Sequence, residues 1–139
     1  MKERIVVVSG YFNPIHIGHL DMMEQAKKLG DRLVVIVNND EQQILKKDRI
    51  IIPVEERARI VRALKIVDEV VISIDLDETV CKTLEMIQPD IFANGGDRKN
   101  EASIPESYIC DMINCELVFG IGGNKKADSS SRIIKEANL

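Results

Sequence analysis

The sequence predicts an α/β fold in which a doubly wound sheet of five parallel strands carries helices on both faces. Two observations lead to this prediction. Short apolar runs recur along the chain, and most are nearly continuous and rich in Val and Ile, as is typical of strands buried on both faces. Segments with apolar residues at helical spacing separate these runs, and strand–helix alternation favours parallel strands joined by right-handed crossovers.

Each expected element follows from one of these two patterns. The strands are expected at residues 5–8, 33–37, 70–74, 91–93 and 117–119, and the helices at 17–29, 54–64, 78–87, 104–113 and 130–137. The charged segment 41–49 and the segment 97–103 are expected to be flexible connections. Because 139 residues suit one hydrophobic core, residues 1–139 are expected to form a single Rossmann-like domain. The expected inward-facing helix residues are Leu20, Met23, Ala26, Leu29, Ala58, Val61, Leu64, Val80, Leu84 and Ile87.

The composition excludes several classes of protein. A net charge of −4 and a pI near 5.2 argue against non-specific nucleic-acid binding. No apolar run approaches the roughly 20 residues that span a bilayer, and the first run is too short for a signal peptide, so a cytoplasmic location and no membrane partner are expected. Cys81, Cys110 and Cys115 are widely spaced and lack a CxxC pair, which predicts ordinary reduced thiols.

The only two histidines of the chain, His16 and His19, lie where the first helix is expected to begin. At this spacing both side chains share one face of the first helical turn. Gly10 and Gly18 permit a ligand to approach the backbone closely, and the helix N-terminus adds main-chain N–H groups. In a doubly wound sheet the ligand lies past the carboxyl ends of the strands. The pattern therefore predicts a phosphate site with two imidazole donors.

Two simpler interpretations of the histidine pair compete with the phosphate site. Both side chains could lie on the surface without a function, or they could bind a metal ion. A zinc site needs at least three protein ligands, and no third candidate lies near the pair in sequence. The position of the pair, directly after a strand and a glycine, favours the phosphate site.

The segment Gly10-Tyr-Phe-Asn-Pro-Ile-His16-Ile-Gly18-His19-Leu resembles the signature of the HxGH nucleotidyltransferase superfamily. The likeness is greatest to members that act on sugar or polyol phosphates, such as heptose-1-phosphate adenylyltransferase and glycerol-3-phosphate cytidylyltransferase. The resemblance implies that His16 and His19 hold a triphosphate and stabilise the transition state. It also implies that the residues around them bind the nucleotide, namely Gly10, Tyr11, Phe12, Asn13 and Gly18.

A second signature of this superfamily is a turn rich in serine or threonine that opens a late helix. The segment Asp128-Ser129-Ser130-Ser131-Arg132 matches it. The resemblance implies that Ser129, Ser130 and Ser131, together with the helix N-terminus, hold the β- and γ-phosphates. A plain serine N-cap is the alternative, and it accounts for one serine but not for three.

Two further segments resemble the same superfamily. Lys46 and Lys47 lie in the loop expected after the second strand, where relatives place a lysine that contacts phosphates, and Lys46 is expected to assist catalysis. The alternative is a solvated charge run. The residues Asn94, Gly95, Gly96 and Asp97 resemble a Gly-Gly-Asp turn that lines the base and ribose, and a simple turn is the alternative.

Three other positions refine the comparison with the superfamily. Arg57, in the helix expected at 54–64, either faces the site or lies on the surface. Asn13 stands where many relatives have Asp. Asn124, beside Lys125 and Lys126, stands where cytidylyltransferases have an arginine, and lysine lacks the planar fork of that residue. This last departure favours adenylyl transfer over cytidylyl transfer.

The resemblance implies transfer of a nucleoside monophosphate, AMP more than CMP, from ATP or CTP with Mg²⁺ to a small phosphorylated acceptor, with release of pyrophosphate. A sugar or polyol phosphate is the expected acceptor, and FMN, phosphopantetheine and nicotinamide mononucleotide are the alternatives. A non-catalytic nucleotide-binding regulatory module and an aminoacyl-tRNA synthetase fragment are further alternatives, although the lysine-rich second signature of the synthetases is absent. By analogy with small relatives, a homodimer is expected.

Overall fold

The computed structural model describes residues 2–47, 49–95 and 105–121. Within these ranges five strands form one sheet in the order β3-β2-β1-β4-β5, and every neighbouring pair is parallel. The fold class predicted from the sequence is therefore confirmed. The strands are β1 (Ile5–Gly10), β2 (Arg32–Val37), β3 (Glu69–Ile72), β4 (Ile91–Gly95) and β5 (Glu116–Ile121).

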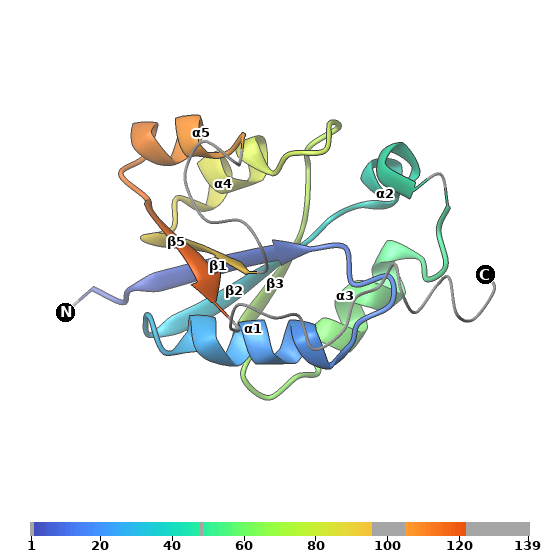
Figure 1. Ribbon diagram of the computed structural model, residues 1–139, viewed down its shortest axis with the longest axis horizontal. Coiled ribbons are helices and arrows are strands. Elements are labelled where there is room, and N and C mark those ends of the chain that lie inside the picture. Colours follow the sequence, from blue (N-terminus) through green and yellow to red (C-terminus); the bar gives the residue numbers. More distant parts are fainter. Residues whose placement is uncertain (1, 48, 96–104, 122–139) are drawn as a thin grey trace.

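Helices cover both faces of the sheet (Figure 1). One face carries α1 (Ile17–Lys27) and α3 (Val54–Arg62), and the other carries α4 (Cys81–Ile87) and α5 (Ser107–Met112). Alternate residues of β1 enter the two cores: Val6 and Val8 belong to the core on the α1 side, and Val7 belongs to the core on the α4 side. All three valines are fully buried, which explains why the apolar runs in the sequence are continuous.

The strand order places a topological switch point between β1 and β4. The chain runs outward from β1 through β2 to β3, and then crosses back to add β4 and β5 on the other side of β1. The pairing of Val6 with Ile91 fixes the register at this junction. Ligands of doubly wound sheets bind past the carboxyl ends of the strands at such a point. The turn that follows β1 and contains the histidines therefore lies where this rule expects a site.

The expectation that residues 41–49 form a flexible connection is wrong for most of that segment. Residues Asp40–Lys47 form the helix α2. Asn39 begins it with a capping box: its Oδ1 accepts the N–H of Gln42 at 2.8 Å, and Gln42 Oε1 accepts the N–H of Asn39 at 3.0 Å. Lys46 accordingly extends from a helix rather than from a loop.

The other expected elements are present with shifted ends wherever the structure describes them. The helix expected at 104–113 is α5, which begins at Ser107. The expected inward-facing helix residues are all buried or half-buried. The segment 97–103 and the helix expected at 130–137 lie outside the described residues.

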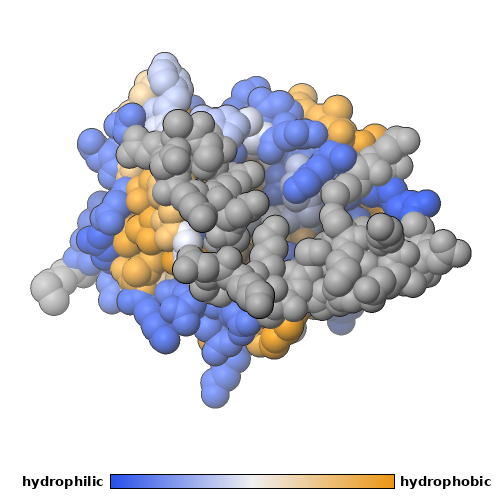
Figure 2. All heavy atoms as spheres, viewed as in Figure 1, coloured by the Kyte–Doolittle hydropathy of each residue, from blue (hydrophilic) through white to orange (hydrophobic). Residues whose placement is uncertain are grey.

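On the face that Figure 2 shows, the described residues form hydrophilic areas with hydrophobic areas between them. Ion pairs gather near the amino ends of the strands, where Lys27 pairs with Asp68 and Arg32 pairs with Glu69 at 2.8 Å. This end of the sheet is opposite to the histidine turn. Among the described residues, no helix has the length and apolar character that crossing a bilayer requires.

Candidate active site

In the turn between β1 and α1, both histidines take part in capping the N-terminus of α1. His16 is the N-cap of α1, and its Nδ1 accepts the N–H of Gly18 at 3.1 Å. In return, Nδ1 of His19 accepts the N–H of His16, also at 3.1 Å. Two imidazoles thus form a capping box, in which Ser or Thr and Glu or Gln are the usual partners.

The hydrogen bonds of the two rings determine where each ring carries its proton. A main-chain N–H only donates, so an Nδ1 atom that accepts from it must be unprotonated. Each neutral ring then holds its proton on Nε2. The ring centroids of His16 and His19 lie 3.8 Å apart, with 33° between the planes. The pair therefore places two Nε2–H groups at the N-terminus of α1, where the positive end of the helix dipole also favours an anion.

Gly10 ends β1 at a point where the ring of Phe12 folds back over it. A Cβ at residue 10 would lie 2.8 Å from Cζ of Phe12, closer than real Cβ contacts. Phe12 is 1% exposed, has a left-handed φ of 52°, and meets the ring of His19 edge to face, with centroids 4.7 Å apart. The absence of a side chain at Gly10 therefore allows Phe12 to support His19. A direct contact of Gly10 with a nucleotide stays a prediction.

Asn13 connects the histidine turn to the loop before α3. Its side chain is 2% exposed, and its Oδ1 accepts the N–H groups of Ile51 at 3.2 Å and Ile52 at 2.8 Å. An aspartate here would accept the same two bonds, so Asn13 keeps the connection without a charge. Its Nδ2 is buried and has no hydrogen-bond partner among the described residues. Buried donors normally have partners, which makes Nδ2 a candidate donor to a bound anion.

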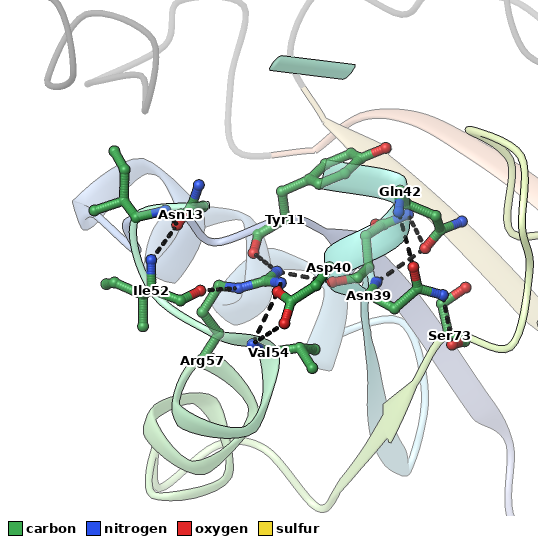
Figure 3. A network of polar contacts seen from close by, with 11 residues as sticks. Tyr11, Asn13, Asn39, Asp40, Gln42, Ile52, Val54, Arg57 and Ser73 are labelled. Atoms are coloured by element: carbon green, nitrogen blue, oxygen red, sulfur yellow. Dashed lines mark hydrogen bonds and ion pairs between the residues drawn. The ribbon is translucent and has the colours of Figure 1, made fainter. Parts of the chain in front are cut away.

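Arg57 lies at the centre of the polar network beneath the turn (Figure 3). The interpretation as a surface arginine is wrong, because the residue is 1% exposed. Its Nη1 donates to the carbonyl oxygens of Tyr11 at 2.6 Å and Asn38 at 2.7 Å. Its Nε donates to the carbonyl of Ile52 at 2.7 Å, and its Nη2 donates to Oδ1 of Asp40 at 2.6 Å. One guanidinium thus joins the segments after β1 and β2 to the segment before α3.

The helix α2 brings Lys46 to the same turn. Its Nζ lies 4.4 Å from the centroid of the Tyr11 ring, at a distance typical of a cation–π contact. Asp40, the first residue of α2, accepts the N–H of Val54 at 3.0 Å as well as the bond from Arg57. The helix is thereby held to α3 at its start and reaches the histidine turn near its end.

The segment after β3 is hydrogen-bonded to the N-cap and first turn of α2. Nδ2 of Asn39 donates to the carbonyl of Asp75 at 2.8 Å, and Nε2 of Gln42 donates to the carbonyl of Asp77 at 2.7 Å. Hydrogen bonds from the hydroxyl and the N–H of Thr79 lower the pKa of Asp77. The segments that follow β1, β2 and β3 therefore form one connected polar rim.

The residues predicted to bind the base and the outer phosphates are only partly described. Asn94 and Gly95 are the last residues of β4 rather than a free turn, and Asn94 is buried. A Cβ at Gly95 would lie 3.1 Å from Sδ of Met22, so α1 packs closely against this end of β4. Several other predicted residues lie outside the described part of the chain: Gly96, Asp97, Ser129, Ser130 and Ser131, together with the side chain of Lys47.

Neither a metal cluster nor a disulfide is built into the described part of the molecule. No group of three or more His, Cys, Asp or Glu side chains in the described ranges could hold a metal ion. Cys81, Cys110 and Cys115 are free thiols in or beside the core under α4 and α5, on the opposite face of the sheet from α1. Burial raises the pKa of the Cys81 thiol, which keeps it protonated near neutral pH.

The sequence and the fold of this chain are both similar to those of known proteins. The family model described as Cytidylyltransferase-like matches residues 7–136. FAD synthase of Ferroglobus placidus is 46% identical over 114 residues, which cover 81% of this chain and 73% of that protein. The bifunctional protein HldE of Koribacter versatilis is 43% identical over 127 residues, which cover 89% of this chain and 24% of that protein. The chain thus spans about a quarter of the length of its HldE relatives.

A solved structure has the same architecture. The lipopolysaccharide core biosynthesis protein of Thermoplasma volcanium GSS1 superposes with a TM-score of 0.74 at 28% identity, over 91% of this chain and 100% of that one. The family match includes both the histidine turn and the serine-rich segment, the two segments on which the sequence resemblance depends. The chain therefore belongs to the cytidylyltransferase-like family of nucleotidyltransferases.

Proposed function

We propose that this chain transfers AMP from MgATP to a small phosphorylated acceptor and releases pyrophosphate. One observation carries the proposal: His16 and His19 present two Nε2–H donors at the N-terminus of α1, next to the switch point of the sheet. Membership of the family supports the same reaction class. In this proposal residues 1–139 act as one nucleotidyltransferase domain.

The proposed chemical step is an in-line displacement at the α-phosphorus. An oxygen of the acceptor phosphate forms a bond to the α-phosphorus of ATP. The bond from that phosphorus to the oxygen bridging to the β-phosphorus breaks, and pyrophosphate leaves with the electron pair. Such a reaction depends on positioning and charge stabilisation rather than on a protein nucleophile.

In this proposal three side chains of the described site stabilise the transferred charge. His16 and His19 donate from Nε2 to triphosphate oxygens, and Lys46 moves from the Tyr11 ring to the leaving pyrophosphate. Mg²⁺ enters with the triphosphate, since it prefers phosphate oxygens and water to a dedicated set of protein ligands.

The sequence resemblance implies the remaining proposed contacts. Asn13 has the clearest structural support, because its buried Nδ2 lacks a partner among the described residues. Three serines are proposed to hold the β- and γ-phosphates, as the sequence resemblance implies. The other proposed nucleotide contacts are Gly10, Tyr11, Phe12, Gly18, Lys47, Asn94, Gly95, Gly96 and Asp97, and the serines are Ser129, Ser130 and Ser131.

We propose a sugar or polyol phosphate as the first acceptor to test and FMN as the second. The likeness to a lipopolysaccharide core biosynthesis protein, over the full length of that protein, supports a sugar phosphate. The likeness to FAD synthases at up to 46% identity supports FMN, because joining AMP to FMN produces FAD. Both acceptors carry a phosphate monoester that can attack the α-phosphorus.

A matrix of nucleotides and acceptors tests this function. The purified chain is incubated with Mg²⁺, with ATP or CTP, and with a sugar 1-phosphate, glycerol 3-phosphate or FMN, while pyrophosphate and product mass are measured. We expect ATP and one acceptor to give equal amounts of pyrophosphate and adenylylated product, and His19→Ala to abolish both. Binding of ATP without pyrophosphate release from any pair would instead identify a non-catalytic nucleotide-binding module.

The assembly and location of the chain are also proposals. By analogy with small relatives we propose a homodimer in the cytoplasm. Light scattering of the purified chain, at several protein concentrations, gives the mass that decides between monomer and dimer.

A further inference from the structure

An ion pair between the buried Arg57 and the half-buried Asp40 joins the helix that carries Lys46 to the turn that carries the histidines. We propose that Arg57 and Asp40 are positioning residues, which fix Lys46 relative to His16 and His19 without touching the nucleotide. This inference rests on the proposed transfer reaction, because it concerns how the triphosphate site of that reaction is assembled.

The contacts of Arg57 leave it no role as a phosphate ligand. Its side chain is fully buried, and four of its five N–H donors already point to oxygen atoms of the protein. The planar fork of a guanidinium can reach oxygens in several directions at once, whereas a lysine ammonium is a point charge on a flexible chain. Arg57 therefore acts as a junction between segments.

The four acceptors of Arg57 come from four different parts of the chain. Tyr11 follows β1, Asn38 follows β2, Asp40 begins α2, and Ile52 precedes α3. The carbonyls of Tyr11 and Asn38 share one nitrogen, which sets the spacing of the carboxyl ends of two neighbouring strands.

Asp40 completes the junction from the side of the helices. Both of its carboxylate oxygens accept the N–H of Val54, at 3.0 and 3.2 Å. Pro53, the N-cap of α3, makes no side-chain cap bond, so Asp40 caps α3 from a distance while it begins α2. One carboxylate thereby fixes the relative position of two helix starts.

Lys46 depends on this junction through two connections. The ring of Tyr11 lies beneath its Nζ, and the carbonyl of the same Tyr11 is bound by Arg57. Along α2, Lys46 lies about 9 Å from Asp40, because each helical residue adds about 1.5 Å. A small rotation of α2 at Asp40 is therefore enlarged at Lys46, and a misplacement of about 1 Å in such a site costs about 100-fold in rate.

The decisive variant is Asp40→Asn, which removes the charge and keeps an oxygen for the N–H of Val54. Arg57→Lys is the second variant, and Arg59→Lys, at an exposed position of the same helix, is the matched control. For each we would measure the circular dichroism spectrum, the KM for MgATP and for the acceptor, and MgATP binding by calorimetry. The same variants are then repeated in a Lys46→Ala background.

We expect folded Asp40→Asn to raise the KM and the Kd for MgATP by about 10-fold while the acceptor KM changes by less than about 2-fold. In the Lys46→Ala background the same substitution should change the MgATP values by less than about 3-fold, since coupled sites are not additive. The control should match the wild type. If Asp40→Asn does not fold, Arg57→Lys is judged by the same criteria.

Three results would overturn the inference. The first is a folded Asp40→Asn variant, or a folded Arg57→Lys variant in its place, with wild-type MgATP affinity. The second is an equal loss of MgATP affinity with and without Lys46, which would show that the ion pair does not act through Lys46. The third is failure of both variants to fold, which would assign the pair to stability alone. Failure of the proposed function has a different signature, namely no pyrophosphate from the wild type, and calorimetry of MgATP still tests the junction in that case.

Discussion

The imidazole rings of His16 and His19 lie with their centroids 3.8 Å apart, and each ring is oriented by a main-chain N–H that its Nδ1 accepts. One nitrogen of each ring, Nδ1, therefore holds the helix cap, and the other, Nε2, is the nitrogen that carries the proton used in the proposed reaction. Because different nitrogens are involved, the structural contribution and the proposed catalytic contribution of each histidine can be separated by mutation.

Replacement of His16 by Asn separates these two contributions. Asn is among the best N-cap residues, so His16→Asn should keep the cap of α1, whereas His16→Ala should cost about 1 kcal/mol of stability. Both substitutions remove the Nε2–H donor and should lower kcat by roughly 100- to 1,000-fold. Thermal unfolding and pyrophosphate release measure the two effects. An active His16→Asn variant would show that the Nε2–H group does not take part in the reaction.

The protonation site of the two rings is a second prediction. Both neutral rings should carry their proton on Nε2, because both Nδ1 atoms accept hydrogen bonds. Long-range ¹H–¹⁵N correlation spectra of the histidine side chains at pH 8 distinguish the two nitrogens. A proton found on Nδ1 of either ring would be incompatible with the capping box, and would remove the basis for the proposed donors.

Gly10→Ala should disturb the site through Phe12. The new Cβ would lie 2.8 Å from Cζ of a buried ring that contacts His19, and overpacking of this kind costs about 1–3 kcal/mol. Phe12→Leu shortens that side chain, so the double variant should lose less stability than the two single variants add up to. Denaturant unfolding of all four proteins measures this coupling. Strict additivity would mean that residue 10 is constrained by something other than the ring.

Asp68 should contribute stability that is lost in acid. Hydrogen bonds from Lys27 and from the N–H of Leu33 lower its pKa below the unfolded value of 3.8. Its contribution is therefore fully present above that value and disappears as the pH falls through the lower, folded pKa. Asp68→Asn should lower the free energy of unfolding at pH 7 by an amount within the roughly 0–1 kcal/mol typical of exposed pairs. The Tm at pH 7 should fall accordingly.

The difference in Tm between Asp68→Asn and the wild type should shrink as the pH is lowered below about 4. Glu85→Gln, at an exposed position of α4, is the control and should leave Tm almost unchanged at both extremes. A difference that grows in acid would contradict the sign of the pKa shift.

Much of the fold could be predicted because its signals are local. The strands of a parallel sheet are buried on both faces, so runs such as Val6, Val7 and Val8 are continuous and easily found. The histidine turn could be placed at the end of the first strand by the same means. Its capping geometry was not predicted, since histidine is not among the usual capping residues.

The helix α2 and the burial of Arg57 escaped prediction for two different physical reasons. The two large apolar residues of α2, Ile44 and Leu45, are exposed, so the helix has no buried apolar stripe. Its stability comes from the Asn39 and Gln42 capping box and from Asp40, which binds Arg57 across the fold. The capping pattern is visible in the sequence, whereas the acceptors of Arg57 are spread over more than forty positions and become neighbours only in the folded chain.

Three of the four oxygen atoms around the Arg57 guanidinium belong to the main chain, at Tyr11, Asn38 and Ile52. Every amino acid presents the same carbonyl, so this junction is indifferent to the identity of the side chains it holds. Substitutions at those three positions therefore leave in place the carbonyl oxygens that Arg57 binds, so the hydrogen bonds that hold the ends of β1 and β2 to the segment before α3 do not require particular side chains there.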